Sequence, residues 1–401
     1  MSIGTSRLLA FVALLMGCQS SVPERPANAI SIGALLPFTG ATSGAGETLE
    51  RSILMVAEQI NAAGGIAGRP LWIESRDTHS NVEVGLAAGQ DLIEQGVFAI
   101  VGPEEPDLAV AMIPALNRAQ VPMISVGASS PPAGLQFSSY WFRIVPTGTV
   151  LGQALADRMH SDKVQSPALI FVNDEYGRAM ATAIQAQFEK SGGRFSLVMS
   201  FEPGSADLSP VLRRLLAVQQ DGVVLVTYPA SASSIIAAIP EMAGRSARFY
   251  LTPSLRSEVF LQNVIPSQVE GAVGVSAALP ADASAFASTF ATRWSGEQPI
   301  VGDYFYFDAT AVAALALQAA ASAVGPGFSP RDVQKNISPV TSPGGLVVTW
   351  EELVPALTEL RGGKAVVYRG ASGPLGFDDS NNVAQPLIQL WKIQNGQIIP
   401  D

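Results

Sequence analysis

The sequence predicts an α/β protein made of two lobes, each built on a doubly wound parallel β-sheet. Short apolar segments rich in β-branched residues alternate with helical segments of about 10–15 residues, which is the pattern of βαβ units. This alternation runs in two series of similar length, one before Val150 and one after it. Of the 401 residues, 48% are hydrophobic and only 14% are charged. Parallel sheets covered on both faces require this apolar composition.

The first series of elements starts at Ile30 and follows a short N-terminal polar segment. Apolar residues at helical spacing and closing glycines, such as Gly64 and Gly65, mark its helices. The sequence predicts strands at 30–36, 71–75, 98–101 and 123–126, and helices at 49–60, 81–95 and 107–119.

The second series shows the same alternation and ends in a long alanine-rich segment. The run 309–324 contains Gln318 and stops at Gly325-Pro326, so we expect a buried helix there and no membrane span. Strands are predicted at 168–172, 195–201, 223–227, 248–251 and 273–277, and helices at 151–159, 178–191, 208–219, 233–243 and 283–294.

The N-terminus has the features of an export signal. Arg7 precedes a nine-residue apolar run, 8–16, which is too short to span a bilayer. The segment ending in Gly17-Cys18 resembles a bacterial lipobox, which implies a signal peptide at 1–17, lipidation of Cys18 and a flexible tether at 18–29. The alternative is an ordinary signal peptide with an incidental cysteine.

Composition argues against several classes of function. A net charge of −10 argues against nucleic acid, whose phosphates require clustered Lys and Arg. One cysteine and two histidines are too few for zinc-finger or iron–sulfur sites. Residues 378–389 look calcium-like, but they depart from the loop pattern at Val383 and Gln389. No motif predicts a cofactor, a metal site or an enzyme.

Several motifs resemble those of type I periplasmic binding proteins, the leucine/isoleucine/valine-binding family of ABC importers. The most specific is INAAGGIAGRPL at 60–71. The others follow in the family's order: IGALLPFTG at 32–40, VGP at 101–103, PMIS at 122–125, DEYG at 174–177, EG at 270–271 and GPLGFD at 373–378.

This resemblance implies two lobes joined by a three-segment hinge, with a ligand bound between them. It places residues 30–148 and 279–370 in one lobe, and 149–278 and 371–401 in the other. The implied function is capture of a small polar ligand, such as an amino acid or amide, for an ABC permease and ATPase complex. The protein would be exported, periplasmic or at the cell surface, and held at the membrane by its lipid. The alternative is a regulatory lipoprotein of the same fold, for example a cell-wall synthase activator.

The resemblance also suggests site residues in the first lobe. Ser125 is a candidate at the start of one loop, and later in that loop a backbone group at Ala128 and the hydroxyl of Ser129 match the positions that hold an amino acid's polar groups. Asp107 lies where amino-acid binders usually carry Ser or Thr. An ionised Asp107 would repel a carboxylate. It therefore either selects a different ligand or stabilises the start of its own helix.

Three further candidates come from the second lobe. Tyr176 and Tyr228 follow predicted strands and match family positions that close over the ligand, although both could simply pack at the edge of the core. Ser254, or Pro253 if the alignment shifts by one residue, stands where amino-acid binders carry an acid.

Overall fold

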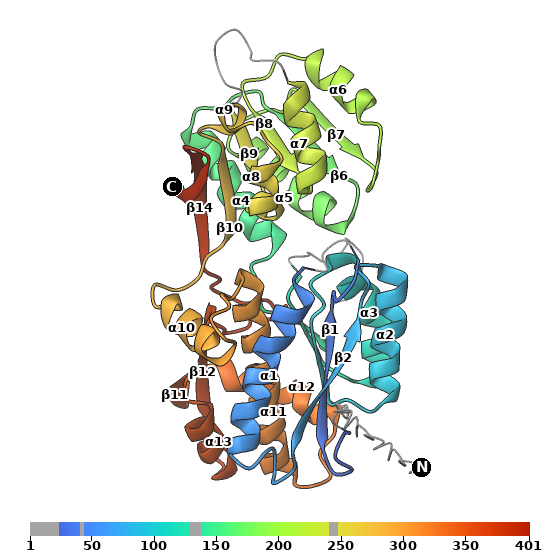
Figure 1. The fold of residues 1–401 in the computed structure, drawn as a ribbon, viewed down its shortest axis with the longest axis vertical. Coiled ribbons are helices and arrows are strands. Elements are labelled where there is room, and N and C mark those ends of the chain that lie inside the picture. Colours follow the sequence, from blue (N-terminus) through green and yellow to red (C-terminus); the bar gives the residue numbers. More distant parts are fainter. Residues whose placement is uncertain (1–23, 41–43, 128–137, 240–247) are drawn as a thin grey trace, which may run out of the picture.

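The computed structural model describes residues 24–40, 44–127, 138–239 and 248–401, which form two lobes stacked along the long axis (Figure 1). The lower lobe in this view combines the start of the chain with the orange segments near its end. The upper lobe combines the middle of the chain with the red strand β14. Each lobe is therefore assembled from segments that are far apart in the sequence.

The first lobe contains a five-stranded parallel sheet in the order β2-β1-β3-β4-β5. Residues 30–36 of β1 pair in register with residues 71–77 of β2. A second sheet of three strands, in the order β11-β12-β13, completes this lobe. The bounds of these strands are β1 Ile30–Leu36, β2 Leu71–Asp77, β3 Ala99–Val101, β4 Met123–Ser125, β5 Trp141–Arg143, β11 Leu346–Thr349, β12 Val366–Gly370 and β13 Gly373–Pro374.

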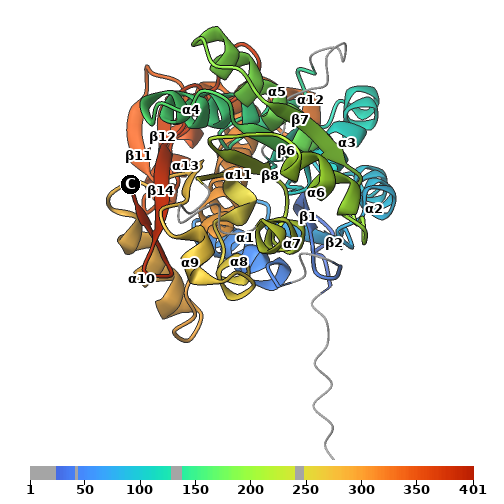
Figure 2. The same cartoon turned by 90° about the horizontal axis from the view of Figure 1, so that it is seen from above.

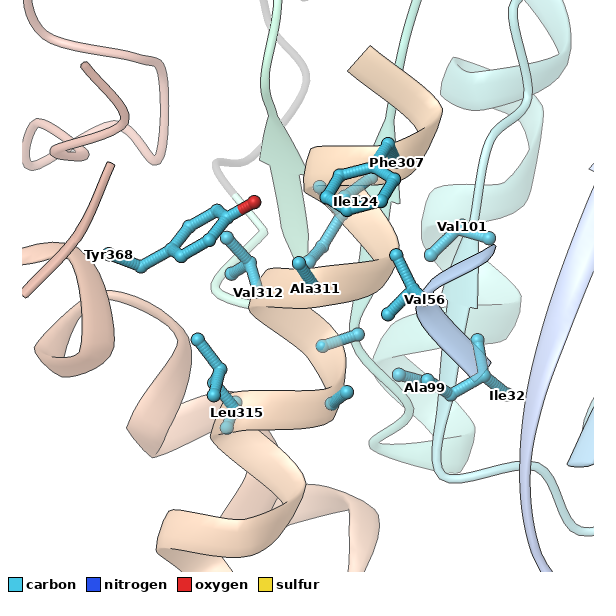
Figure 3. Close-up of a cluster of buried hydrophobic side chains, with 14 of the residues drawn as sticks. Ile32, Val56, Ala99, Val101, Ile124, Phe307, Ala311, Val312, Leu315 and Tyr368 are labelled. Atoms are coloured by element: carbon cyan, nitrogen blue, oxygen red, sulfur yellow. The ribbon is translucent and has the colours of Figure 1, made fainter. Parts of the chain in front are cut away.

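Helices cover both faces of the five-stranded sheet. One core lies between the sheet and α1 and α11, and Figure 3 shows part of it, with Ile32, Val56 and Phe307 pointing toward one another. Leu92, Leu108 and Met112 form a second core on the opposite face. The helices of this lobe are α1 Gly46–Ala62, α2 Val82–Glu94, α3 Pro106–Ala119, α10 Ala283–Arg293, α11 Val301–Val324, α12 Pro330–Ile337 and α13 Leu353–Arg361, with the 3₁₀ turn η2 at Pro339–Thr341.

The second lobe contains a seven-stranded sheet in the order β15-β14-β10-β9-β8-β6-β7. Its strands are β6 Ala168–Val172, β7 Leu197–Phe201, β8 Val223–Val226, β9 Phe249–Leu251, β10 Val273–Ala277, β14 Ile388–Gln394 and β15 Gln397–Pro400. Its helices are α4 Gly148–Ser161, α5 Glu175–Lys190, α6 Ser209–Leu216, α7 Pro229–Ala238, α8 Glu258–Gln262 and α9 Pro266–Val269, with the 3₁₀ turn η1 at Pro253–Leu255. Figure 2 shows these helices around the sheet from above.

The structure differs from the predicted elements in several respects, and it adds the elements α8, α9, α12, α13 and β11 to β13. The second sheet is mixed, because β14 and β15 add to it in antiparallel orientation. Helix α7 begins at Pro229, four residues before the predicted start, because proline is favoured in the first turn of a helix. Strand β5, Trp141–Arg143, was not predicted.

The glycine-rich motif at 60–71 turns the chain from α1 into β2. Asn61 Nδ2 donates to the carbonyl of Leu71 at 2.9 Å, and Leu71 N–H donates to Asn61 Oδ1 at 2.7 Å. Gly65 has φ +74°, and a Cβ there would lie 2.0 Å from the Arg69 carbonyl oxygen. The motif therefore fixes the entry of β2 beside β1.

Helix α11 is the one helix of the described residues that is long and apolar enough to span a membrane. In the structure, 78% of its apolar window is buried inside the protein. It packs against α1, α12 and α13 in the first lobe, so its apolar surface serves the core, as expected for residues 309–324.

The chain passes three times between the main cores of the two lobes. The crossings lie between Val145 and Leu151, between Val275 and Phe286, and between Leu375 and Trp391. A small cavity lies where they meet, lined by residues of all three, including Pro146, Ala278 and Pro386. The three-segment connection therefore agrees with the predicted fold class.

Candidate ligand-binding site

Four of the predicted site residues follow the carboxyl ends of parallel strands. Asp107 comes after β3 in the first lobe, and Tyr176, Tyr228 and Ser254 come after β6, β8 and β9 in the second. In open α/β sheets this edge is where ligands bind. The candidate site therefore lies at the facing ends of the two lobes.

The structure brings the three second-lobe residues together. The rings of Tyr176 and Tyr228 stack with centroids 5.8 Å apart and an interplanar angle of 29°. The Tyr176 hydroxyl lies 3.0 Å from Ser254 Oγ, and Ser254 Oγ donates to the carbonyl of Thr227 at 2.6 Å. Because the serine proton is used there, Tyr176 is the donor to Ser254. Tyr176 is 7% exposed and Tyr228 is 43% exposed, so Tyr228 offers the accessible ring.

Asp174 connects this aromatic pair to the start of α5. Its Oδ1 accepts from Gly177 N–H at 2.7 Å as the helix N-cap, and its Oδ2 accepts from the Tyr228 hydroxyl at 2.9 Å. Burial, and next the Asp174 charge, raise the pKa of Tyr228 above its ordinary value. Tyr228 therefore stays protonated and donates to Asp174.

Asp107 joins the two lobes. Its Oδ1 accepts a hydrogen bond from Glu175 N–H at 3.0 Å, the first residue of α5 in the second lobe. Burial, and next the charge of Asp174, raise the pKa of Asp107 above its ordinary value. Sequence reasoning left two roles open for this residue, and neither is the contact with the opposite lobe.

The remaining predicted residues lie apart from this cluster or outside the described residues. Ser125 is fully buried in the first lobe, where its hydroxyl accepts from the Trp141 indole at 2.9 Å and lies 3.3 Å from the carbonyl of Phe142. Its side chain is thus engaged with β5. Ala128, Ser129 and Cys18 lie outside the described residues.

Arg256 is a residue that sequence reasoning missed. It follows η1, two residues after Ser254, and donates to Ser276 Oγ at 3.0 Å. Burial lowers the pKa of this guanidinium, and among the described residues it forms no ion pair. A basic residue shortly after the end of a strand, in a chain with few charges, is the sequence signal that could have identified it.

His79 lies in a polar cluster at the ends of β1 and β2. Thr39 Oγ1 lies 2.7 Å from His79 Nδ1 and donates to Asp77 Oδ2 at 2.7 Å. A nucleophilic hydroxyl must instead direct its proton to the base. The cluster therefore holds the loop after β1 against the loop after β2. Among the described residues, no group of three metal-ligating side chains occurs.

A buried carboxylate fixes the start of the third crossing. Asp308, in the middle of α11, accepts hydrogen bonds from the Tyr368 hydroxyl at 2.7 Å, from Ala371 N–H at 2.9 Å and from Ser372 N–H at 2.7 Å. The Ser372 hydroxyl adds a fourth. Burial raises the pKa of Asp308 to about 6.

Comparison with known proteins shows the family. The family model described as "Periplasmic binding protein" matches residues 29–397. The chain therefore belongs to the periplasmic binding protein family, which confirms the resemblance drawn from the motifs and the predicted fold class.

Individual relatives are more distant. A Leu/Ile/Val-binding protein homolog from Brucella melitensis is 25% identical over 202 residues, which is 50% of this chain and 55% of the relative. The match thus spans just over half of that protein's length.

Two solved structures share the fold. They are a branched-chain amino acid substrate-binding protein from Streptococcus pneumoniae in complex with isoleucine, and a solute-binding protein from R. palustris in complex with benzoate. The first has a TM-score of 0.72 at 19% identity, covering 92% of this chain and 97% of its own. The second has a TM-score of 0.71 at 15% identity, covering 93% and 95%.

Proposed function

We propose that this protein is the extracytoplasmic solute-binding subunit of an ABC importer. It captures a small polar ligand, such as an amino acid, an amide or a relative of these, between its two lobes. The observation that carries this proposal is the contact between the lobes at the carboxyl ends of their strands, where the Asp107 side chain accepts from Glu175 N–H, in a chain that crosses three times between the lobes. Such a connection permits hinge closure around a ligand.

Two groups of residues are proposed to contact the ligand. One is the set Asp107, Tyr176, Tyr228 and Ser254 at the facing ends of the lobes, and the other is the loop that begins at Ser125. The exposed ring of Tyr228 offers apolar area, as aromatic side chains do in small-molecule sites. Arg256 adds a guanidinium that a carboxylate could pair with. Ala128 and Ser129 remain proposals from the resemblance.

The lobe limits proposed from the sequence are 30–148 with 279–370, and 149–278 with 371–401. In the structure β13, Gly373–Pro374, still belongs to the three-stranded sheet of the first lobe, so the third crossing begins after it. We propose further that residues 1–17 are removed on export and that Cys18 carries the lipid. The tether at 18–29 then lets the lobes reach a membrane permease and its ATPase partner. This assignment needs no catalytic chemistry, cofactor or metal. The similarity to a transporter substrate-binding protein from Streptococcus pneumoniae supports transport over the regulatory alternative.

A thermal-shift screen of the purified protein tests this proposal. The panel contains amino acids, amides, polyamines and short aromatic and aliphatic acids. A ligand at about 100 times its Kd stabilises the folded state by about 2.7 kcal/mol, which raises the Tm by about 2–4 °C or more. No shift across the panel, together with no change in the radius of gyration, would contradict a solute-binding function.

The variant Tyr228→Ala tests whether a compound that raises the Tm binds at the proposed site. Tyr228 is 43% exposed, so the variant should remain folded while it loses the ligand-dependent rise in Tm. An equal rise in both proteins would mean that the compound binds elsewhere.

A further inference from the structure

The first N–H groups of helix α5 donate hydrogen bonds to side chains of both lobes. A helix leaves its first N–H groups without partners inside the helix. In α5, the N–H of Gly177 donates to Asp174, the N-cap residue of the helix itself. The N–H of Glu175 instead donates to Asp107 of the first lobe at 3.0 Å. The opposite lobe therefore completes the capping of a 16-residue helix.

Asp107 does not serve the same purpose in its own helix. Helix α3 begins at Pro106, and its N-cap Glu105 makes no side-chain cap bond. Glu105 instead accepts from the Thr78 hydroxyl at 2.5 Å, which ties the loop before α3 to the end of β2. Glu105 thereby holds this loop in place while Asp107 reaches across to α5.

The surroundings of Asp107 make the contact sensitive to charge. From α5 and its cap it faces Asp174, Glu175 and Arg178, and from the start of α7 it faces Tyr228. Arg178 pairs with Glu175 at 3.4 Å and donates to the carbonyl of Asn173, so its charge is shared. An ionised Asp107 is thus repelled by Asp174 while it accepts from Glu175 N–H.

We propose that Asp107 is a closure residue, whose side chain accepts a hydrogen bond from the α5 N-terminus and holds the two lobes together before any ligand binds. The contact needs an acceptor oxygen and no charge. A protonated carboxyl retains its carbonyl oxygen and loses the repulsion from Asp174. The lobes of the ligand-free protein should therefore close more as the pH falls.

The direction of the pKa shift agrees with this. The closed arrangement raises the pKa of Asp107, so the closed state binds the proton more tightly than an open state in which water surrounds the carboxyl. By linkage, protonation favours closure, and closure is lost as the pH rises through the raised pKa.

Two substitutions separate the acceptor from the charge. Asp107→Asn keeps an oxygen acceptor and removes the charge, whereas Asp107→Ala removes both. Glu83→Ala is the control, because Glu83 is an exposed acid in the first turn of α2 and lies in none of the three crossings. Circular dichroism verifies that each variant is folded.

The experiment uses the full chain without ligand, at pH 7 and pH 5. Small-angle scattering gives the radius of gyration, and hydrogen exchange corrected for intrinsic pH dependence gives the protection of the Glu175 amide. We expect the wild-type protein and the Glu83→Ala control to be more compact at pH 5. Asp107→Asn should be compact at both values. Asp107→Ala should be expanded at both, with Glu175 exchanging about tenfold faster or more, as expected for a lost hydrogen bond.

The proposal is overturned if Asp107→Ala retains wild-type protection of the Glu175 amide, or if Asp107→Asn keeps the pH dependence of the wild type. Because no ligand is present, either result would leave the proposed solute-binding function intact. Conversely, a thermal-shift screen without hits would leave this closure contact standing.

Discussion

Replacing Asp308 by Asn tests whether a buried charge lies at the third crossing. Asp308 is fully buried in α11, and its four hydrogen bonds all come from residues 368–372, just before the chain leaves the first lobe. The substitution preserves size and one acceptor oxygen, and it removes the ionisable group.

The magnitude follows from the pKa of this carboxyl. Burial raises it from 3.8 to about 6, which corresponds to about 3 kcal/mol of unfolding free energy between the protonated and ionised forms. Because the folded pKa is the higher one, the neutral carboxyl is fully stabilising below about pH 4. That stability is lost as the pH rises toward and through about 6. The Asn side chain does not titrate and shows no such loss.

The assay is urea unfolding of both proteins at several pH values from 4 to 7. The stability of Asp308→Asn relative to wild type should increase by about 2–3 kcal/mol across this range, whatever its starting value. Asp282→Asn, an exposed substitution, should follow the wild type. A difference between Asp308→Asn and wild type that stays constant with pH would refute the reasoning, because it would mean that the four hydrogen bonds offset the cost of burying the charge.

Three further predictions concern binding, packing and anchoring. Tyr176→Ala should lower the affinity for any ligand found in the screen about tenfold or more, as measured by calorimetry, whereas Tyr176→Phe, which keeps the stacked ring, should lower it much less. Equal affinity in the wild type and both variants would exclude Tyr176 from the site. Gly370→Ala should destabilise the protein by about 1–3 kcal/mol in thermal unfolding, because its Cβ would lie 2.1 Å from Asp308 Oδ2, and an unchanged Tm would contradict this packing. Cys18→Ser should move the exported protein from the membrane fraction to the soluble fraction, and continued membrane association would count against lipidation.

Much of the fold was predictable because its signals are local. Alternating apolar segments identified the parallel strands of the two larger sheets apart from β5, and paired glycines marked the end of α1. The antiparallel strands β14 and β15 were missed. Strand β14 pairs with β10 across more than 100 positions, and β15 joins the sheet only by pairing with β14. Nothing in the period of an isolated segment indicates such a partner.

The site was predictable in part for the same reason. Tyr176, Tyr228 and Ser254 follow strands of one sheet, so their proximity follows from the order of those strands. The bond between Asp107 and Glu175 joins different lobes, and no local pattern encodes it. Ser125 illustrates the converse, because the hydroxyl of this candidate residue is engaged by Trp141 of an unpredicted strand.

The sequence by itself determined the class of fold, the family and the neighbourhood of the candidate site, since all three depend on periodicity and short motifs. Only the tertiary structure decided which polar groups are already used. Hydrogen bonds at Ser125, Asp107 and Asp308 link residues from 16 to 68 positions apart. A buried polar group must find a partner, and the partner depends on how the lobes pack and not on neighbouring residues in the chain.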